Sequence, residues 1–324
     1  MQVFDGHTDI LADVVAYRQL GQVQVFRRKH LPKLKQGCVQ HGNFALWMDP
    51  AFAGPAQLKA AMNHVQDELA EAADICMQVR KYSDFQEAAV EKRIAVVMGV
   101  EGLKGIGEDL DLLDWLYYQG IRWASLTWNE ANSLATGIYG DTARGLTAKG
   151  KDAVRKMNQL GILVDVSHLN EASFRDVMQV TTKPVMASRS NAWALCRHPR
   201  NLKDSQIKAI VEAKGIIGVN AWPDFLHATT PSAVHYVDQI EYLISLAGID
   251  HVAMGFDFCD FLPMPDRDRN KAQKYTALLE DARHIQNVIE IMRERRIPEE
   301  MIQQAARHNF LHFYQSAWEK PEPA

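Results

Sequence analysis

The chain has 324 residues, of which 47% are hydrophobic and 23% are charged, and its formal net charge is −4 at pH 7. This composition supports a sizeable core and excludes a disordered chain. A mildly acidic chain also lacks the basic surface that nucleic acid or an anionic membrane requires, so neither is an expected partner. No membrane-spanning run or secretory leader is visible, and the four cysteines are widely spaced, which predicts a cytoplasmic protein without disulfides.

Short apolar runs alternate with helical patterns along the whole chain. Several runs are apolar on both faces, which is typical of strands in a parallel sheet covered by helices. Eight strands are predicted, at residues 3–4, 44–47, 94–100, 121–128, 162–166, 184–187, 215–221 and 251–256. Helices are predicted at residues 57–81, 109–119, 147–160, 205–213, 232–247, 271–295 and 299–318, with Thr147 and Gly161 as start and stop signals.

This alternation predicts an α/β fold, namely one (β/α)₈ TIM-type barrel domain over residues 1–324 with a helical C-terminal extension. An open, doubly wound sheet is the alternative, and it would require a glycine-rich phosphate loop after an early strand. Gly102, Gly105 and Gly107 follow the third predicted strand but lack that spacing. We therefore expect residues 102–107 to form a flexible loop.

Residues capable of acid–base and metal chemistry follow several of the predicted strands. They are His7 and Asp9, Glu101, His168, and Asp257. Each alone is more often a cap or a buried, satisfied side chain, but in a barrel all strand ends converge on one mouth. Imidazole and carboxylate are ligands of zinc and other divalent transition metals, and carboxylates buried together without a cation repel one another. The joint pattern predicts a metal site.

Five segments of the sequence match one known family in order. They are Asp5-Gly6-His7-Thr8-Asp9, Glu101-Gly102, the run from Gly145 to His168, the segment from Cys196 to Leu202, and Gly255-Phe256-Asp257-Phe258. With these motifs the chain resembles the membrane dipeptidase (renal dipeptidase) family of peptidases, in the amidohydrolase superfamily. The resemblance implies a (β/α)₈ metallohydrolase, usually with two zinc ions, that cleaves dipeptides to free amino acids and often forms a homodimer.

The resemblance also implies a role for each matched position. His7 and Asp9 would bind the first metal, Glu101 would bridge to the second, and His168 would bind the second. Asp257 would act with Glu101 in catalysis, taking the proton of a metal-activated water and passing it to the leaving amine.

Three positions concern the substrate or depart from the family pattern. Arg200 would pair with the substrate's terminal carboxylate, which suits a planar bidentate donor. Arg189 stands where the family has a second-metal histidine, and a guanidinium offers no lone pair to a metal. We therefore expect at most one tightly bound zinc, with Arg189 in the place of the second ion and neutralising Glu101. Trp128 replaces a substrate-contacting histidine of some members and could supply an apolar wall.

Two functions stay open at this point. The first is a working metal-dependent dipeptidase with a single metal, or a related hydrolase of another amide or a lactone. The second is a degenerate, non-catalytic member that acts as a binding or structural protein. The preserved ligand and acid–base positions favour the first, and Arg189 favours the second.

Overall fold

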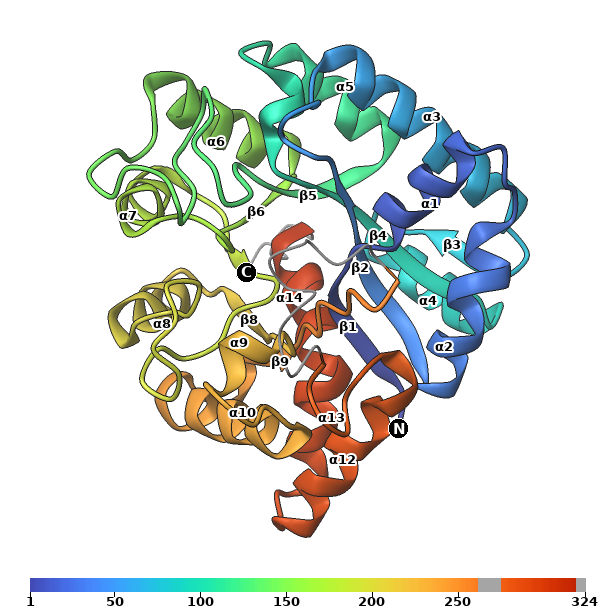
Figure 1. Cartoon of the computed structure of the whole chain (residues 1–324), viewed down its shortest axis with the longest axis vertical. Helices are drawn as coiled ribbons and strands as arrows, with labels where there is room; N and C mark the ends of the chain where they lie inside the picture. The colour runs from blue at the N-terminus through green and yellow to red at the C-terminus, as the bar shows by residue number, and fades with distance from the viewer. Residues whose placement is uncertain (262–274, 319–324) are drawn as a thin grey trace, which may run out of the picture.

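The computed structural model describes residues 1–261 and 275–318. Eight strands follow one another in a parallel sheet: β1 (Val3–Thr8), β2 (Val39–Trp47), β4 (Ile94–Glu101), β5 (Ile121–Ser125), β6 (Leu163–Asp165), β7 (Met186–Ala187), β8 (Ile216–Val219) and β9 (Val252–Met254). The chain after β9 returns to β1, where Thr8 pairs with Phe258 and the Asp257 N–H donates to the His7 carbonyl at 3.1 Å. The sheet is thus a nearly closed barrel ringed by helices (Figure 1), which confirms the predicted fold class.

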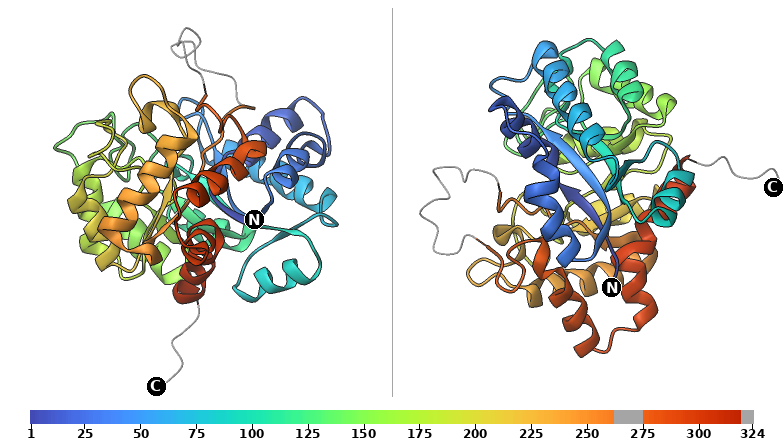
Figure 2. Two further views of the ribbon diagram at one scale, coloured as in Figure 1. Left: turned by 90° about the horizontal axis from the view of Figure 1, so that it is seen from below. Right: turned by 90° about the vertical axis from the view of Figure 1, so that its right-hand side faces the viewer.

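Most of the helices surround the barrel on its outside, as the two views in Figure 2 show, whereas α14 (Asn309–Trp318) lies across one end of it. The other helices of the described residues are α1 (Ile10–Gln19), α2 (Leu31–Gln36), α3 (Pro55–Glu71), α4 (Ser83–Val90), α5 (Asp111–Gln119), α6 (Ala148–Leu160), α7 (Glu171–Val180), α8 (Asp204–Glu212), α9 (Pro223–Leu226), α10 (Ala233–Ala247), α12 (Ile285–Glu294) and α13 (Glu299–Gln303). Short 3₁₀ turns lie at Leu103–Ile106, Ile249–His251 and Ala282–His284, and π turns at Phe26–His30 and Gln304–His308. The predicted ends of α6 are correct, because the Thr147 side chain accepts from Gly150 N and Gly161 adopts a φ of 80°.

Several predicted boundaries were wrong. The helix predicted at 57–81 ends at Glu71, and Cys76–Gln78 forms a further strand, β3, which pairs with the start of β4. A three-residue strand has no measurable periodicity, and only its partner strand specifies it. The helix predicted at 271–295 begins at Ile285, and residues 271–274 lie outside the described residues. The loop predicted at residues 102–107 contains a 3₁₀ turn, and a π turn interrupts the helix predicted at 299–318. The sequence analysis did not predict helices α1, α2, α4, α7 and α9.

Helix α14 fills the end of the barrel at which the strands begin. Phe310 stacks on Phe4 of β1 with ring centroids 4.7 Å apart. The Tyr314 hydroxyl reaches inside and donates to Asn43 Oδ1 at 2.6 Å, and Asn43 Nδ2 donates to the Gly6 carbonyl at 3.0 Å. Aromatic side chains therefore pack this end, which leaves the carboxyl ends of the strands for a site.

His41 lies in the same aromatic packing and makes the stability of the barrel depend on pH. Its ring stacks on Phe4 at 5.7 Å, Nδ1 has no partner among the described residues, and burial, assisted by Arg307, lowers its pKa to about 3. Because the unfolded chain takes up this proton near pH 6.5 and the folded chain does not, stability falls as pH drops below 6.5. We expect a loss of about 2 kcal/mol between pH 6.5 and 5.

The variant His41→Phe keeps the stacking and removes the titration. Urea unfolding of both proteins at several pH values should show a flatter dependence for the variant. Parallel curves for the two proteins would contradict a neutral, buried His41.

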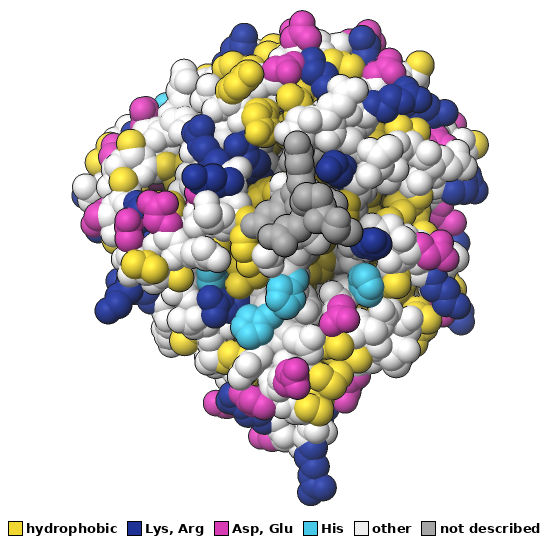
Figure 3. Space-filling view, turned by 180° about the vertical axis from the view of Figure 1, so that it is seen from behind, with side chains coloured by type: hydrophobic (Ala, Val, Ile, Leu, Met, Phe, Trp, Pro, Cys, Tyr) yellow, Lys and Arg dark blue, Asp and Glu magenta, His cyan; other side chains and the backbone are white. Residues whose placement is uncertain are grey.

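The outer surface carries charges of both signs. Acidic and basic side chains are interspersed, with small hydrophobic groups between them, on the face opposite that of Figure 1 (Figure 3). Among the described helices, none combines the length and the apolar character needed to cross a bilayer.

Candidate active site

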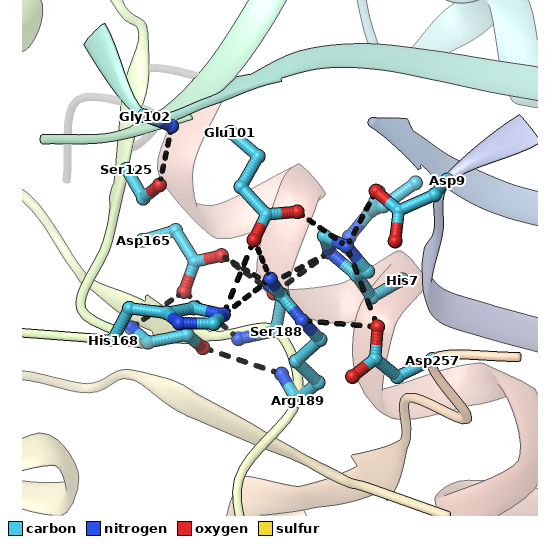
Figure 4. A network of polar contacts seen from close by, with 12 residues as sticks. His7, Asp9, Glu101, Gly102, Ser125, Asp165, His168, Ser188, Arg189 and Asp257 are labelled. Carbon is cyan, nitrogen blue, oxygen red and sulfur yellow. Dashed lines mark hydrogen bonds and ion pairs between the residues drawn. The ribbon is translucent and has the colours of Figure 1, made fainter. Parts of the chain in front are cut away.

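The chemistry-bearing residues predicted from strand ends come together at the carboxyl ends of the strands (Figure 4). His7 is at their centre and comes from the end of β1. Its Nε2 lies 3.2 Å from Glu101 Oε2, 3.6 Å from Asp9 Oδ1 and 3.9 Å from Asp257 Oδ1. His168 approaches from the other side, with Nε2 at 3.2 Å from Glu101 Oε1. The carboxylate of Glu101, the last residue of β4, therefore lies between the two histidines.

The backbone is strained where it delivers these side chains. His168 and Asp257 adopt φ values of 69° and 60°, in the left-handed region that non-glycine residues rarely occupy. Gly102 has a φ of 82° and turns the chain directly after Glu101, and its N–H donates to Ser125 Oγ at 2.9 Å. Such conformations persist only where surrounding contacts hold them, and they concentrate at functional sites.

Arg189 fills the middle of the cluster and is only 2% exposed. Its Nη2 contacts both Glu101 Oε1 and His168 Nε2, its Nη1 lies 3.1 Å from His7 Nδ1, and its Nε lies 3.1 Å from Asp257 Oδ1. Burial opposes its charge, yet Glu101 and then Asp257 raise the pKa of Arg189 further above its usual value. The guanidinium is therefore a permanent cation among the acidic groups.

Three buried imidazole or carboxylate atoms of the cluster make no well-aligned hydrogen bond among the described residues, although they face one another at 3.2–3.6 Å. They are His7 Nε2, Asp9 Oδ1 and Glu101 Oε2. Ligand atoms of His7, Asp9 and Asp257 also lie within 4.8 Å of one another. One imidazole and several carboxylates form a donor set that suits zinc or a similar divalent ion. The atoms on the other side, Glu101 Oε1 and His168 Nε2, are already in contact with Arg189.

The pKa values show that the side of the cluster around His7 favours added positive charge. Burial, together with the nearby Glu101, raises the pKa of Asp9 to about 6. Burial and Arg189 oppose protonation of His7, but the carboxylates of Asp9 and Glu101 raise its pKa to about 9. Burial also opposes ionisation of Glu101, but Arg189 holds its pKa well below the usual value. The cluster thus favours positive charge at His7, between the carboxylates of Asp9 and Glu101.

Neutral side chains that the sequence analysis missed orient the charged ones. Asn129 Oδ1 lies 2.8 Å from His168 Nδ1, and Asn220 Nδ2 donates to Asp257 Oδ2 at 2.9 Å. Ser188 Oγ donates to Asp165 Oδ2 at 2.5 Å and lies 3.2 Å from His7 Nδ1. Asn129 directly follows the strand predicted at 121–128, which is a weak positional signal, whereas Asn220 lies inside the strand predicted at 215–221 and carries none.

Arg200 lies beside the cluster, buried, at the wall of a small pocket that His168 and Ser190 also line. Its Nη2 donates to the Arg189 carbonyl at 3.4 Å, its guanidinium lies over the Phe225 ring, and its Nε has no partner among the described residues. Burial, and then Arg189, lower the pKa of Arg200 to about 10. A buried guanidinium without a carboxylate partner is suited to bind an anionic group.

Trp128 stands at the edge of the same region. Its ring packs edge-on against Trp47 at 5.4 Å and lies 6.3 Å from the ring of His168. The two indoles therefore form an aromatic wall next to the cluster.

A (β/α)₈ barrel with imidazole and carboxylate groups at its mouth has the amidohydrolase-like fold of metal-dependent hydrolases. Within that class the chain belongs to the membrane dipeptidase family (peptidase family M19), whose family model matches residues 1–320. The chain is accordingly a dipeptidase-type hydrolase of peptide bonds.

The chain is also similar to individual proteins of known sequence or structure. The chain is 41% identical over 197 residues to an uncharacterized protein from the pqqA 5′ region of Klebsiella pneumoniae, covering 57% of this chain and 72% of that one. It is 34% identical over 194 residues to dipeptidase aclJ of Aspergillus oryzae, covering 58% and 46%. A solved metallopeptidase of Rhodobacter sphaeroides, bound to a phosphinate mimic of the dipeptide L-Ala-D-Ala, superimposes with a TM-score of 0.86 at 24% identity over 98% of this chain and 99% of that one.

Proposed function

We propose that the chain is a dipeptidase that uses a single divalent metal ion, most simply zinc. His7, Asp9 and Glu101 would hold this ion, and Arg189 takes the place of a second one. One observation carries the proposal. The ligand atoms divide into a set around His7 Nε2, whose members face only one another, and a set already in contact with the Arg189 guanidinium.

Charge repulsion supports the binding of one metal ion rather than two. Two unit charges 4 Å apart repel by about 4 kcal/mol at an effective dielectric constant of 20, and a divalent ion beside a guanidinium repels about twice as strongly. Arg189 contacts Oε1 of Glu101, whereas Oε2 of Glu101 faces His7 Nε2 at 3.2 Å. A single ion can therefore bind beside Arg189, and a second ion would have to displace it.

Three residues of this chain have separate roles in the proposed reaction. A bound divalent ion lowers the pKa of a water molecule and polarises the scissile carbonyl. Asp257, whose Oδ1 faces His7 Nε2 at 3.9 Å, takes the proton of the attacking water and passes it to the leaving amine. Arg200 binds the terminal carboxylate of the dipeptide, and Trp128 limits the space beside the scissile bond.

Metal content and turnover test the proposal together. The purified protein is passed through a gel-filtration column, analysed for metals and assayed with a panel of dipeptides. One equivalent of zinc with hydrolysis of at least one dipeptide is expected. Two equivalents would contradict the single site. A dipeptide that binds and is not cleaved by the zinc-loaded protein would instead support the non-catalytic alternative.

Replacing Arg200 with methionine is expected to weaken substrate binding. A charge-assisted hydrogen bond to a carboxylate contributes about 1.5–3 kcal/mol, so KM should rise roughly 10- to 100-fold with little change in kcat. Steady-state kinetics on the best dipeptide measure both constants. Arg197→Met is the matched control, because Arg197 lies in the same segment but stacks on Trp193 at 5.0 Å. If the two substitutions change KM equally, Arg200 does not bind the substrate carboxylate.

A further inference from the structure

Asn220 directly follows β8 and is fully buried behind the candidate active site. Its Nδ2 donates to Asp257 Oδ2 at 2.9 Å, and its Oδ1 accepts the Trp222 N–H at 2.5 Å. The backbone N–H at Trp222 can only donate, so the carboxamide oxygen must face it and the NH₂ group must face Asp257. The orientation of the amide is therefore fixed by its surroundings.

Asn191 fixes the backbone of Asn220 in the same way. Asn191 Oδ1 accepts the Asn220 N–H at 2.9 Å, and Asn191 Nδ2 donates to the Asn220 carbonyl at 3.0 Å. Both asparagines are fully buried, and an unmade hydrogen bond there costs about 1–3 kcal/mol. Asn220 is thus a rigid donor at a defined position.

This donor gives the two oxygens of Asp257 different surroundings. Oδ2 accepts from Asn220, whereas Oδ1 lies 3.1 Å from Arg189 Nε and 3.9 Å from His7 Nε2. Asp257 also has a φ of 60°, a conformation that needs external contacts to hold it. A neutral amide can orient the carboxylate without weakening it as a base, as a lysine ammonium at position 220 would.

We propose that Asn220 is a positioning residue that fixes the Asp257 carboxylate with Oδ1 turned toward the metal ligands. The proposal deepens the proposed function, because the catalytic role of Asp257 belongs to that function. A carboxylate that rotates freely would present its reactive oxygen in the required direction only part of the time. The expected consequence of losing Asn220 is a slower chemical step with unchanged substrate binding.

Kinetics of Asn220→Asp test this consequence. The substitution keeps the size of the side chain and the acceptor for Trp222 but places a carboxylate against Asp257. A misplacement of about 1 Å at a reacting group can cost about 10²-fold in rate, so we expect kcat to fall by that order with KM and zinc content unchanged. Asn191→Asp is the matched control, because it disturbs the same turn and leaves the Asp257 donor intact. Equal losses of kcat in the two variants, or an unchanged kcat in Asn220→Asp, would overturn the proposal.

A double-mutant cycle tests the contact without any activity assay. Asn220→Asp alone should lower the Tm by about 4 °C. Combined with Asp257→Asn, it exchanges the amide and the carboxylate and restores one donor–acceptor pair, so the double variant should regain at least half of that loss. Additive losses of Tm would show that residues 220 and 257 do not interact. That result would contradict the inference, whatever substrate the protein hydrolyses. If the pair couples but the wild type cleaves no dipeptide, the proposed function fails and the contact stands.

Discussion

Replacing Arg189 with histidine is expected to raise the zinc content from one to two equivalents per chain and to increase dipeptide hydrolysis. The change frees Glu101 Oε1 and His168 Nε2, which now contact the guanidinium, and supplies a third ligand for a second ion. If only half of the repulsion of about 8 kcal/mol between a divalent ion and the guanidinium is recovered, about 4 kcal/mol, the affinity at that position rises about 10³-fold. Elemental analysis and kcat/KM measure the two effects.

Arg189→Met separates the loss of the cation from the gain of a ligand. It should stay at one equivalent of zinc, because it adds no donor atom. It should also be less stable by about 3–5 kcal/mol, because Glu101 and Asp257 lose their buried counter-charge. If Arg189→His changes neither the metal content nor the turnover, Arg189 is not what suppresses the second site.

Asp257→Asn is expected to reduce kcat by about 10²- to 10⁴-fold, the usual contribution of a positioned acid–base group. Asparagine fills the same space and can still accept the Asn220 hydrogen bond, so KM, zinc content and Tm should change little. Steady-state kinetics and metal analysis check these expectations. Asp260→Asn removes the next acid along the chain, which pairs with Lys33, and should leave kcat near the wild-type value. A variant Asp257→Asn that retains full activity would exclude Asp257 as the proton carrier.

The strands of the barrel were predictable because each is an apolar run between helical patterns. The lengths of the strands were less predictable. The run predicted at 121–128 ends as a strand at Ser125, after which the chain leaves the sheet and places Trp128 and Asn129 beside His168. Strand β3 was not predictable, because three residues carry no periodic signal and only the start of β4 specifies it.

The charged residues of the candidate site could be found from residue type and position after a strand. Opposite charge also predicts that Arg189 contacts Glu101, as it does. The sequence analysis missed Asn129, Ser188 and Asn220. Neutral side chains have many structural uses, and no sequence pattern distinguishes one that touches a catalytic group. The left-handed φ values of His168 and Asp257 likewise depend on contacts made by distant parts of the chain.

The aromatic packing of α14 in one end of the barrel also bears on how products leave. Phe310 and Tyr314 are buried against β1 and β2, so within the described residues aromatic side chains close that side of the barrel. Both amino acids released from a dipeptide must leave by the opening through which the next dipeptide enters. The amino acid that carries the original carboxylate would still match Arg200 after cleavage. Turnover at this site should therefore slow as that amino acid accumulates, with the free product acting as a competitor of the substrate.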